Sequence, residues 1–230
     1  MTDDCQKGWD YTMKKLIFFA LIVLMFTSSK ALATAQYPDK IVYNGITYSL
    51  YSNPMEAYFE KNPGKKPKGE VGSSALWRGY VATFEIVNGS VHLKDIEIRV
   101  REDKSKSITG FKSVLEEVVE PGKTLKIDWF SGILVLPEGK LINYVHMGYE
   151  STYEKYILLA VEKSNFTSER RFDDKEYEVF KQKQFEEFKK TPAYKKAIDE
   201  ITKQGNFDPK FADDFLKGFI TSYTSKFLVN

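Results

Sequence analysis

Apolar residues alternate with polar ones along much of the first two-thirds of the chain, which is the period of a β-strand with one buried face. The first alternating stretch is interrupted at Asn44-Gly45. Both central residues of the tightest hairpin turn need positive φ, and Asn-Gly accepts it readily. The sequence therefore predicts a β-hairpin here. Its buried face is expected to carry Ile41, Tyr43, Ile46, Tyr48 and Leu50.

A second, longer hairpin is predicted at Asn88-Gly89. The register that this turn sets places Phe84 opposite Leu93, so that apolar residues share one face of the pair. Beyond Leu93 the apolar positions change parity, because the next ones are Ile96 and Ile98. This change predicts a β-bulge near Lys94-Asp95.

Shorter elements follow before the pattern changes. Helices are predicted at residues 54–60 and 111–118, and strands at residues 125–130, 133–136, 141–147 and 153–162. From Asp173 onward the period is helical, and three helices are predicted at residues 174–190, 192–205 and 208–228. A run of strands followed by a run of helices is the order of an α+β fold rather than of βαβ units.

The sequence therefore predicts one α+β domain over residues 36–230. Residues 36–170 are expected to form a largely antiparallel sheet built from hairpins, and residues 171–230 the helices packed on it. The last helix has a wide apolar stripe, which we expect to pack on the sheet, with association at a membrane surface as the alternative. The stripe consists of Phe211, Phe215, Leu216, Phe219, Ile220, Tyr223 and Phe227.

The N-terminal residues have the three parts of a secretory signal peptide. Lys14 and Lys15 precede an apolar run over residues 16–26, and small residues follow it. Cleavage after Ala33 or after Ala35 satisfies the small-residue rule equally well. The sequence therefore predicts that residues 1–35 are a signal peptide and that the protein is periplasmic in a Gram-negative cell, or secreted.

Two further expectations concern this leader. The acidic residues Asp3, Asp4 and Asp10 oppose a positive n-region, so we expect the true start at Met13. A helix over residues 16–26 rises only about 16 Å, roughly half of the hydrocarbon thickness of a bilayer. No stable membrane anchor is therefore expected after cleavage.

Composition narrows the chemistry. The only cysteine is Cys5, in the leader, and the two histidines are His92 and His146. Cysteine–histidine catalysis is therefore excluded for the mature chain, and a multi-histidine zinc site is disfavoured. The net charge of +2, from 34 basic and 32 acidic residues, argues against nucleic-acid binding. We expect no cofactor and no metal.

Candidate binding residues come from two patches rich in aromatic and cationic side chains, which dominate interface hot spots. Arg78 enters a predicted strand with the parity of Tyr80 and Phe84, so its side chain is expected to point inward. A buried guanidinium needs a carboxylate or carbonyl partner, which leaves a structural ion pair and the capture of a ligand as two interpretations. The six candidates are Trp77, Arg78, Tyr144, His146, Tyr149 and Tyr153.

Three segments, residues 52–59, 75–84 and 144–149, resemble those of a family of small exported Gram-negative proteins, some encoded near polymorphic or contact-delivered toxins. The resemblance extends over most of the mature chain and implies an immunity role. It supplies no catalytic residues.

The sequence is therefore typical of a non-enzymatic, exported protein-binding module whose partner is a toxin or an envelope protein. Two alternatives stay open. One is a periplasmic hydrolase that uses paired carboxylates, which would need a pocket holding two such groups. The other is a binder of small ligands or envelope glycans.

Overall fold

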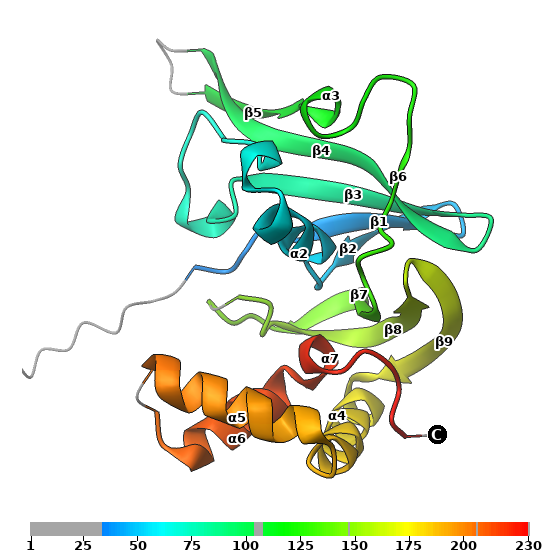
Figure 1. Ribbon diagram of the computed structural model, residues 1–230, viewed down its shortest axis with the longest axis vertical. Coiled ribbons are helices and arrows are strands. Elements are labelled where there is room, and N and C mark those ends of the chain that lie inside the picture. Colours follow the sequence, from blue (N-terminus) through cyan, green and yellow to red (C-terminus); the bar gives the residue numbers. More distant parts are fainter. Residues whose placement is uncertain (1–33, 104–107, 147, 206, 230) are drawn as a thin grey trace, which may run out of the picture. The chain divides into compact units, whose positions relative to one another are not determined.

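The computed structural model describes residues 34–103, 108–146, 148–205 and 207–229, and Thr34–Asn230 form one compact unit. This unit is an α+β fold with a nine-stranded sheet (Figure 1). The sheet is antiparallel except for one parallel pair, β1 with β3. The predicted fold class is confirmed. The strands are β1 (Asp39–Tyr43), β2 (Ile46–Leu50), β3 (Tyr80–Val87), β4 (Ser90–Asp103), β5 (Ile108–Ser113), β6 (Leu125–Lys126), β7 (Gly132–Asn143), β8 (Thr152–Glu162) and β9 (Asn165–Asp173).

Helices lie between the strands and at the C-terminal end of the chain. The early ones are short, and the two longest come one after the other behind β9. The helices are α2 (Pro54–Lys61), α3 (Leu115–Val118), α4 (Asp174–Phe188), α5 (Pro192–Gly205), α6 (Pro209–Gly218) and α7 (Ile220–Tyr223), and two 3₁₀ turns are η1 (Pro63–Lys65) and η2 (Ser74–Leu76).

Both Asn-Gly hairpins are confirmed. Asn44 and Gly45 have φ of 50° and 78°, and Asn88 and Gly89 have φ of 50° and 74°. Ile41 and Leu50 are fully buried on the predicted face of the first hairpin. Ile46 is an exception, because it lies beside the turn and more than half of its side chain is exposed.

The predicted β-bulge is also confirmed. Thr83 pairs with Asp95 and Phe84 with Leu93, so Lys94 is the extra residue of β4. The Asp95 carboxylate accepts hydrogen bonds from the backbone N–H of Ile96 and the hydroxyl of Ser113, at 2.8 and 2.6 Å. These bonds stabilise the bend at which β4 changes its pairing partners.

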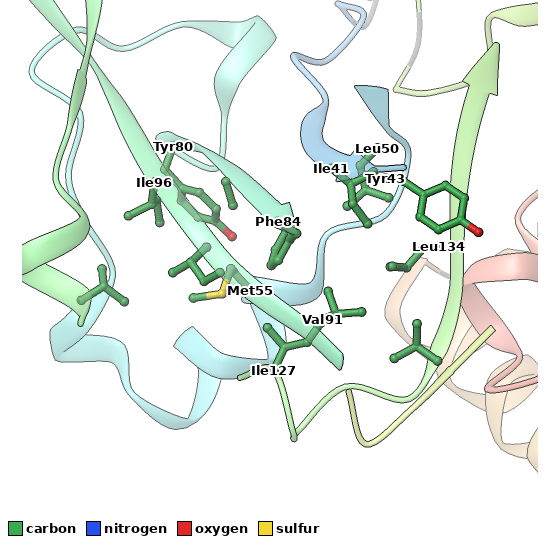
Figure 2. Packing of buried hydrophobic residues seen from close by; sticks show 14 of the residues in the cluster. Ile41, Tyr43, Leu50, Met55, Tyr80, Phe84, Val91, Ile96, Ile127 and Leu134 are labelled. Atoms are coloured by element: carbon green, nitrogen blue, oxygen red, sulfur yellow. The ribbon is translucent and has the colours of Figure 1, made fainter. Parts of the chain in front are cut away.

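The sheet curls so that two groups of strands face one another across the main core. The paired path runs β2-β1-β3-β4-β9-β8-β7. Strand β4 meets β9 at the pair Ser90 and Asn165, and the N–H of Tyr51, just after β2, donates to the carbonyl of Val135 in β7 at 2.8 Å. Side chains from both groups fill the core, and Met55 of α2 joins them (Figure 2).

Strands β7 and β8 bury both of their faces where residues 132–137 pair with residues 156–161, as predicted for residues 157–161. Leu134 and Ile157 belong to the main core, whereas Val135 and Leu158 contact the helical layer. In that layer α4 begins at a capping box between Asp173 and Glu176. Helices α4, α5, α6 and α7 lie together (Figure 1) and share a further apolar cluster.

Two predictions for the middle of the chain are wrong, a break at residues 137–140 and a helix at residues 111–118. Residues 133–136 and 141–143 are one strand, β7, in which Pro137 pairs with Tyr156 and a register shift follows Glu138. A proline is tolerated where its missing N–H would face away from the ladder, or beside a bulge. The predicted helix at residues 111–118 is strand β5 followed by the single turn α3, because residues 108–113 pair with β4.

The predicted C-terminal stripe is only partly core. Leu216 and Ile220 are fully buried, but Phe211 is 45% exposed, and Phe215 and Tyr223 are also exposed. Of the stripe, Leu216 and Ile220 lie in the cluster that α4 and α5 contribute to. The predicted single helix also ends at Gly218, before α7 begins. Among the described residues, no helix combines the length and the apolarity needed to span a bilayer.

Candidate functional site

Arg78 lies directly before β3 with its guanidinium inside the protein. Arg78 is only 3% exposed. The next residue, Gly79, has a φ of +87° and makes the turn that brings the chain into β3. Nη2 is 3.1 Å from Oδ1 of Asp39 and donates at 3.0 Å to the carbonyl of Tyr37. Nη1 donates to the hydroxyl of Tyr149 at 2.5 Å. The guanidinium of Arg78 is therefore bonded to groups of the protein itself. This is the structural ion pair, one of the two interpretations that the sequence left open.

Asp39 connects this ion pair to the sheet. The same Oδ1 also accepts the backbone N–H of Ala82 at 2.9 Å, so one carboxylate oxygen links β1, β3 and Arg78. Within the described part of the chain, Oδ2 of Asp39 and Nε of Arg78 are buried without a hydrogen-bond partner. Removal of a carboxylate from water favours its neutral form. Burial accordingly raises the pKa of Asp39 from 3.8 to about 7, although the charge of Arg78 acts in the opposite direction.

The raised pKa of Asp39 is expected to make the free energy of unfolding fall as pH rises. Its carboxyl holds a proton more tightly in the folded state than in the unfolded chain, so this contribution is present below pH 3.8 and is lost as pH rises through about 7. Asparagine does not titrate. Asp39→Asn should therefore remove this part of the pH dependence of the free energy of unfolding, measured with urea. If that free energy changes with pH in the variant as it does in the unchanged protein, the raised pKa of Asp39 is contradicted.

Tyr149 extends the buried network towards a row of tyrosines. Its hydroxyl donates to Oδ1 of Asn53 at 3.0 Å, and its ring stacks on Tyr51 at a centroid distance of 4.7 Å. The hydroxyl of Tyr51 donates to that of Tyr153 at 3.0 Å. Burial raises the pKa of Tyr149 and of Tyr51, so both phenols stay protonated at neutral pH. The structure thus brings Arg78, Tyr149 and Tyr153 together in an internal network.

Trp77, Tyr144 and His146 point elsewhere. Trp77 is 64% exposed although it follows Leu76 and precedes Arg78, both of which are buried, and Nζ of Lys66 is 5.9 Å from its ring centroid. Tyr144 is 53% exposed and contacts the ring of His146 edge-on at 4.6 Å. These three side chains are available to a partner.

The segment at residues 35–37 ties the two exposed patches together. The N–H of Gln36 donates to the carbonyl of Gly148 at 3.1 Å, and the N–H of Tyr37 donates to that of Ala75 at 2.8 Å. Tyr37 is itself exposed and packs edge-on against exposed Phe111 at 5.8 Å.

We call Tyr37, Trp77, Phe111 and Tyr144 the N-terminal aromatic surface, after the N-terminal residues 35–37 that connect their segments. Sequence reasoning missed Tyr37 and Phe111. The available signal was weak, because Phe111 fits a helical period and Tyr37 stands alone next to the predicted cleavage site.

Two pockets lie away from these residues. One, of about 390 Å³, lies between β9 and α4, and the other, of about 550 Å³, lies beside the β3–β4 hairpin. The first contains one carboxylate, Glu176, and so does the second, Glu85. The paired carboxylates that a hydrolase of this type needs are thus not supplied by either pocket. Across the described ranges, no cluster of three or more His, Cys, Asp or Glu residues could hold a metal ion.

Comparisons with protein-family models, with curated proteins and with solved structures give no match to this chain.

Proposed function

We propose that this chain is an exported, non-enzymatic protein-binding module, and that its partner docks on the N-terminal aromatic surface. The observation that carries the proposal is the exposure of Trp77 together with Tyr144 on segments held by residues 35–37. Large aromatic side chains bury much area at low cost in conformational entropy, and tryptophan and tyrosine are enriched in interface hot spots.

The fixed backbone around these aromatics supports the same function. Gln36 donates through its side chain to the carbonyl of Ser74 at 2.8 Å as well as through its N–H to Gly148. A partner would therefore meet side chains on a preorganised backbone, which lowers the entropy that binding must overcome.

Immunity against a contact-delivered toxin is the specific form that we propose. An immunity protein needs a stable surface that covers the toxin, and needs no catalytic groups of its own. The predicted leader would place it in the periplasm, where an incoming toxin arrives. A cell that lacks the gene should then be killed by siblings that carry the toxin.

The aromatic surface is tested by capture of a partner from the cell envelope with the full-length tagged protein. Trp77→Ser combined with Tyr144→Ser is expected to weaken the captured complex at least about tenfold, since each removed aromatic hot spot costs about 1–2 kcal/mol or more. Ile46→Ser, another exposed apolar residue, should leave the affinity unchanged.

Three results would overturn parts of this proposal. Unchanged affinity in the double variant would remove the aromatic surface from the interface. Survival of the deletion strain among toxin-armed siblings would remove the immunity role. Recovery of the protein from the cytoplasm with its N-terminus at Met1 or Met13 would remove export.

A further inference from the structure

A shallow pocket between β9 and α4 combines an apolar floor with a cationic rim. Its volume is about 390 Å³, within the range of small-molecule sites. Both elements approach one another here because α4 follows β9 directly (Figure 1). The lining residues are Arg170, Arg171 and Phe172 of β9, Lys175, Glu176, Val179, Phe180 and Lys183 of α4, and Val229 near the C-terminus.

The floor of the β9–α4 pocket is apolar. Phe172 stacks on buried Phe180 at a centroid distance of 4.9 Å, and Val229 packs against the same cluster. Val179 is 53% exposed in the middle of α4, so part of this floor faces water. An exposed apolar floor in a concave site is the feature that binds the apolar body of a ligand.

The rim of the β9–α4 pocket has an excess of positive charge. Lys175 and Lys183 lie two helical turns apart on either side of Val179, and among the described residues neither they nor Arg170 makes an ion pair. The carboxylate of Glu176 is engaged, because it accepts the N–H of Asp173 at 2.9 Å. The fourth cation, Arg171, is paired with Glu169 and Glu138.

Arg170 is held in place on this rim. Its guanidinium carbon lies 4.4 Å from the centroid of the Phe227 ring, a stacking contact that leaves the edge of the guanidinium for hydrogen bonding. A planar guanidinium that lines one pocket with two ammonium groups suits a carboxylate or phosphate.

The second pocket provides a contrast. It also contains lysines, but Lys94 is paired with Glu85 and Lys123 with Glu120, and Lys126 donates to Asn165 at 3.2 Å. Two of the three lysines of this pocket are therefore paired with carboxylates. The β9–α4 pocket instead combines an exposed apolar floor with three cations that form no ion pair within the described part of the chain.

We propose that the β9–α4 pocket binds an anionic amphiphile, meaning a single carboxylate or phosphate on an acyl chain or ring. The apolar body lies on Phe172, Val179 and Val229, and the anionic head is held by Arg170, Lys175 and Lys183. A fatty acid and a lipid phosphate are two sources of this chemistry. This site is separate from the N-terminal aromatic surface, so it stands or falls independently of the proposed function.

The test titrates the full-length purified protein with four probes of one chain length: dodecanoate, dodecyl phosphate, dodecan-1-ol and dodecyltrimethylammonium. Calorimetry is expected to show saturable binding of the two anions with Kd below about 100 μM, and thermal unfolding should shift upward with ligand concentration. A preference for dodecanoate or for dodecyl phosphate assigns the head group. The neutral and cationic probes should bind at least about tenfold more weakly.

Variants locate the site. Lys175→Gln combined with Lys183→Gln is expected to weaken binding of the anions about five- to tenfold, and Val179→Asp should abolish it, because each change acts on one half of the ligand. Lys196→Gln, an exposed lysine on α5, is the matched control and should have no effect. The proposal is overturned if neither anion binds with a Kd below about 100 μM, if the alcohol binds as tightly as the anions, or if Lys196→Gln weakens binding as much as the double variant does.

Discussion

Replacing Arg78 with leucine is expected to lower the free energy of unfolding by about 3–5 kcal/mol above pH 7, because a buried ion pair that loses one partner leaves an uncompensated charge. The two side chains are buried almost completely and Nη2 lies 3.1 Å from the Asp39 carboxylate. The loss also removes the bonds to Tyr37 and Tyr149. Urea unfolding of both proteins measures the difference.

The effect of Arg78→Leu should depend on pH. Without the guanidinium, the pKa of Asp39 rises further, so its carboxyl is neutral over a wider range and the destabilisation is smaller in mild acid. Lys94→Ala provides the control, since its ion pair with Glu85 is partly exposed and worth about 0–1 kcal/mol. A loss for Arg78→Leu as small as that for Lys94→Ala would show that the buried pair does not stabilise the fold.

Phe180→Ala is expected to destabilise the protein by about 3–5 kcal/mol, the usual loss when a buried phenylalanine is truncated and a cavity remains. Phe180 is 4% exposed, stacks on Phe172 and meets Phe227 edge-on at 5.8 Å. It therefore connects α4, β9 and the C-terminal segment in one apolar cluster.

The same measurement on Phe211→Ala separates burial from aromatic content. Phe211 is also a helical phenylalanine with stacked neighbours, but it is 45% exposed, so its truncation should cost about 1 kcal/mol or less. Equal losses for the two variants would mean that the exposed stripe on α6 is buried in solution. An unchanged stability of Phe180→Ala would mean that the helical layer contributes little to the cooperative fold.

Local signals in the sequence were sufficient for the hairpins. Asn44-Gly45 and Asn88-Gly89 fix both turn and register, and the parity change after Leu93 revealed the bulge. Strand β9 was missed because its turn is Lys163-Ser164, whose φ values of 45° and 68° neither residue adopts readily. The turn is held by tertiary contacts instead, since the N–H of Ser164 donates to the carbonyl of Phe130.

The candidate site was predicted only in part, for a related reason. The strand parity of Arg78 indicated a buried guanidinium, and this is confirmed. Its partner Asp39 and the contact between Tyr37 and Phe111 join segments far apart in the chain, and only the parallel pairing of β1 with β3 and the curl of the sheet bring them together. Composition and spacing carry no information about such long-range pairing.

The bond from Tyr51 to Val135, which joins β2 to β7, has a consequence for incomplete chains. A truncated chain that stops before Val135 can still form both early hairpins. It leaves the outer edge of β2 without β7 as a neighbour. Unpaired strand edges act as templates for association between molecules. Truncated copies should thus tend to aggregate more than the complete chain, in which β7 lies next to this segment.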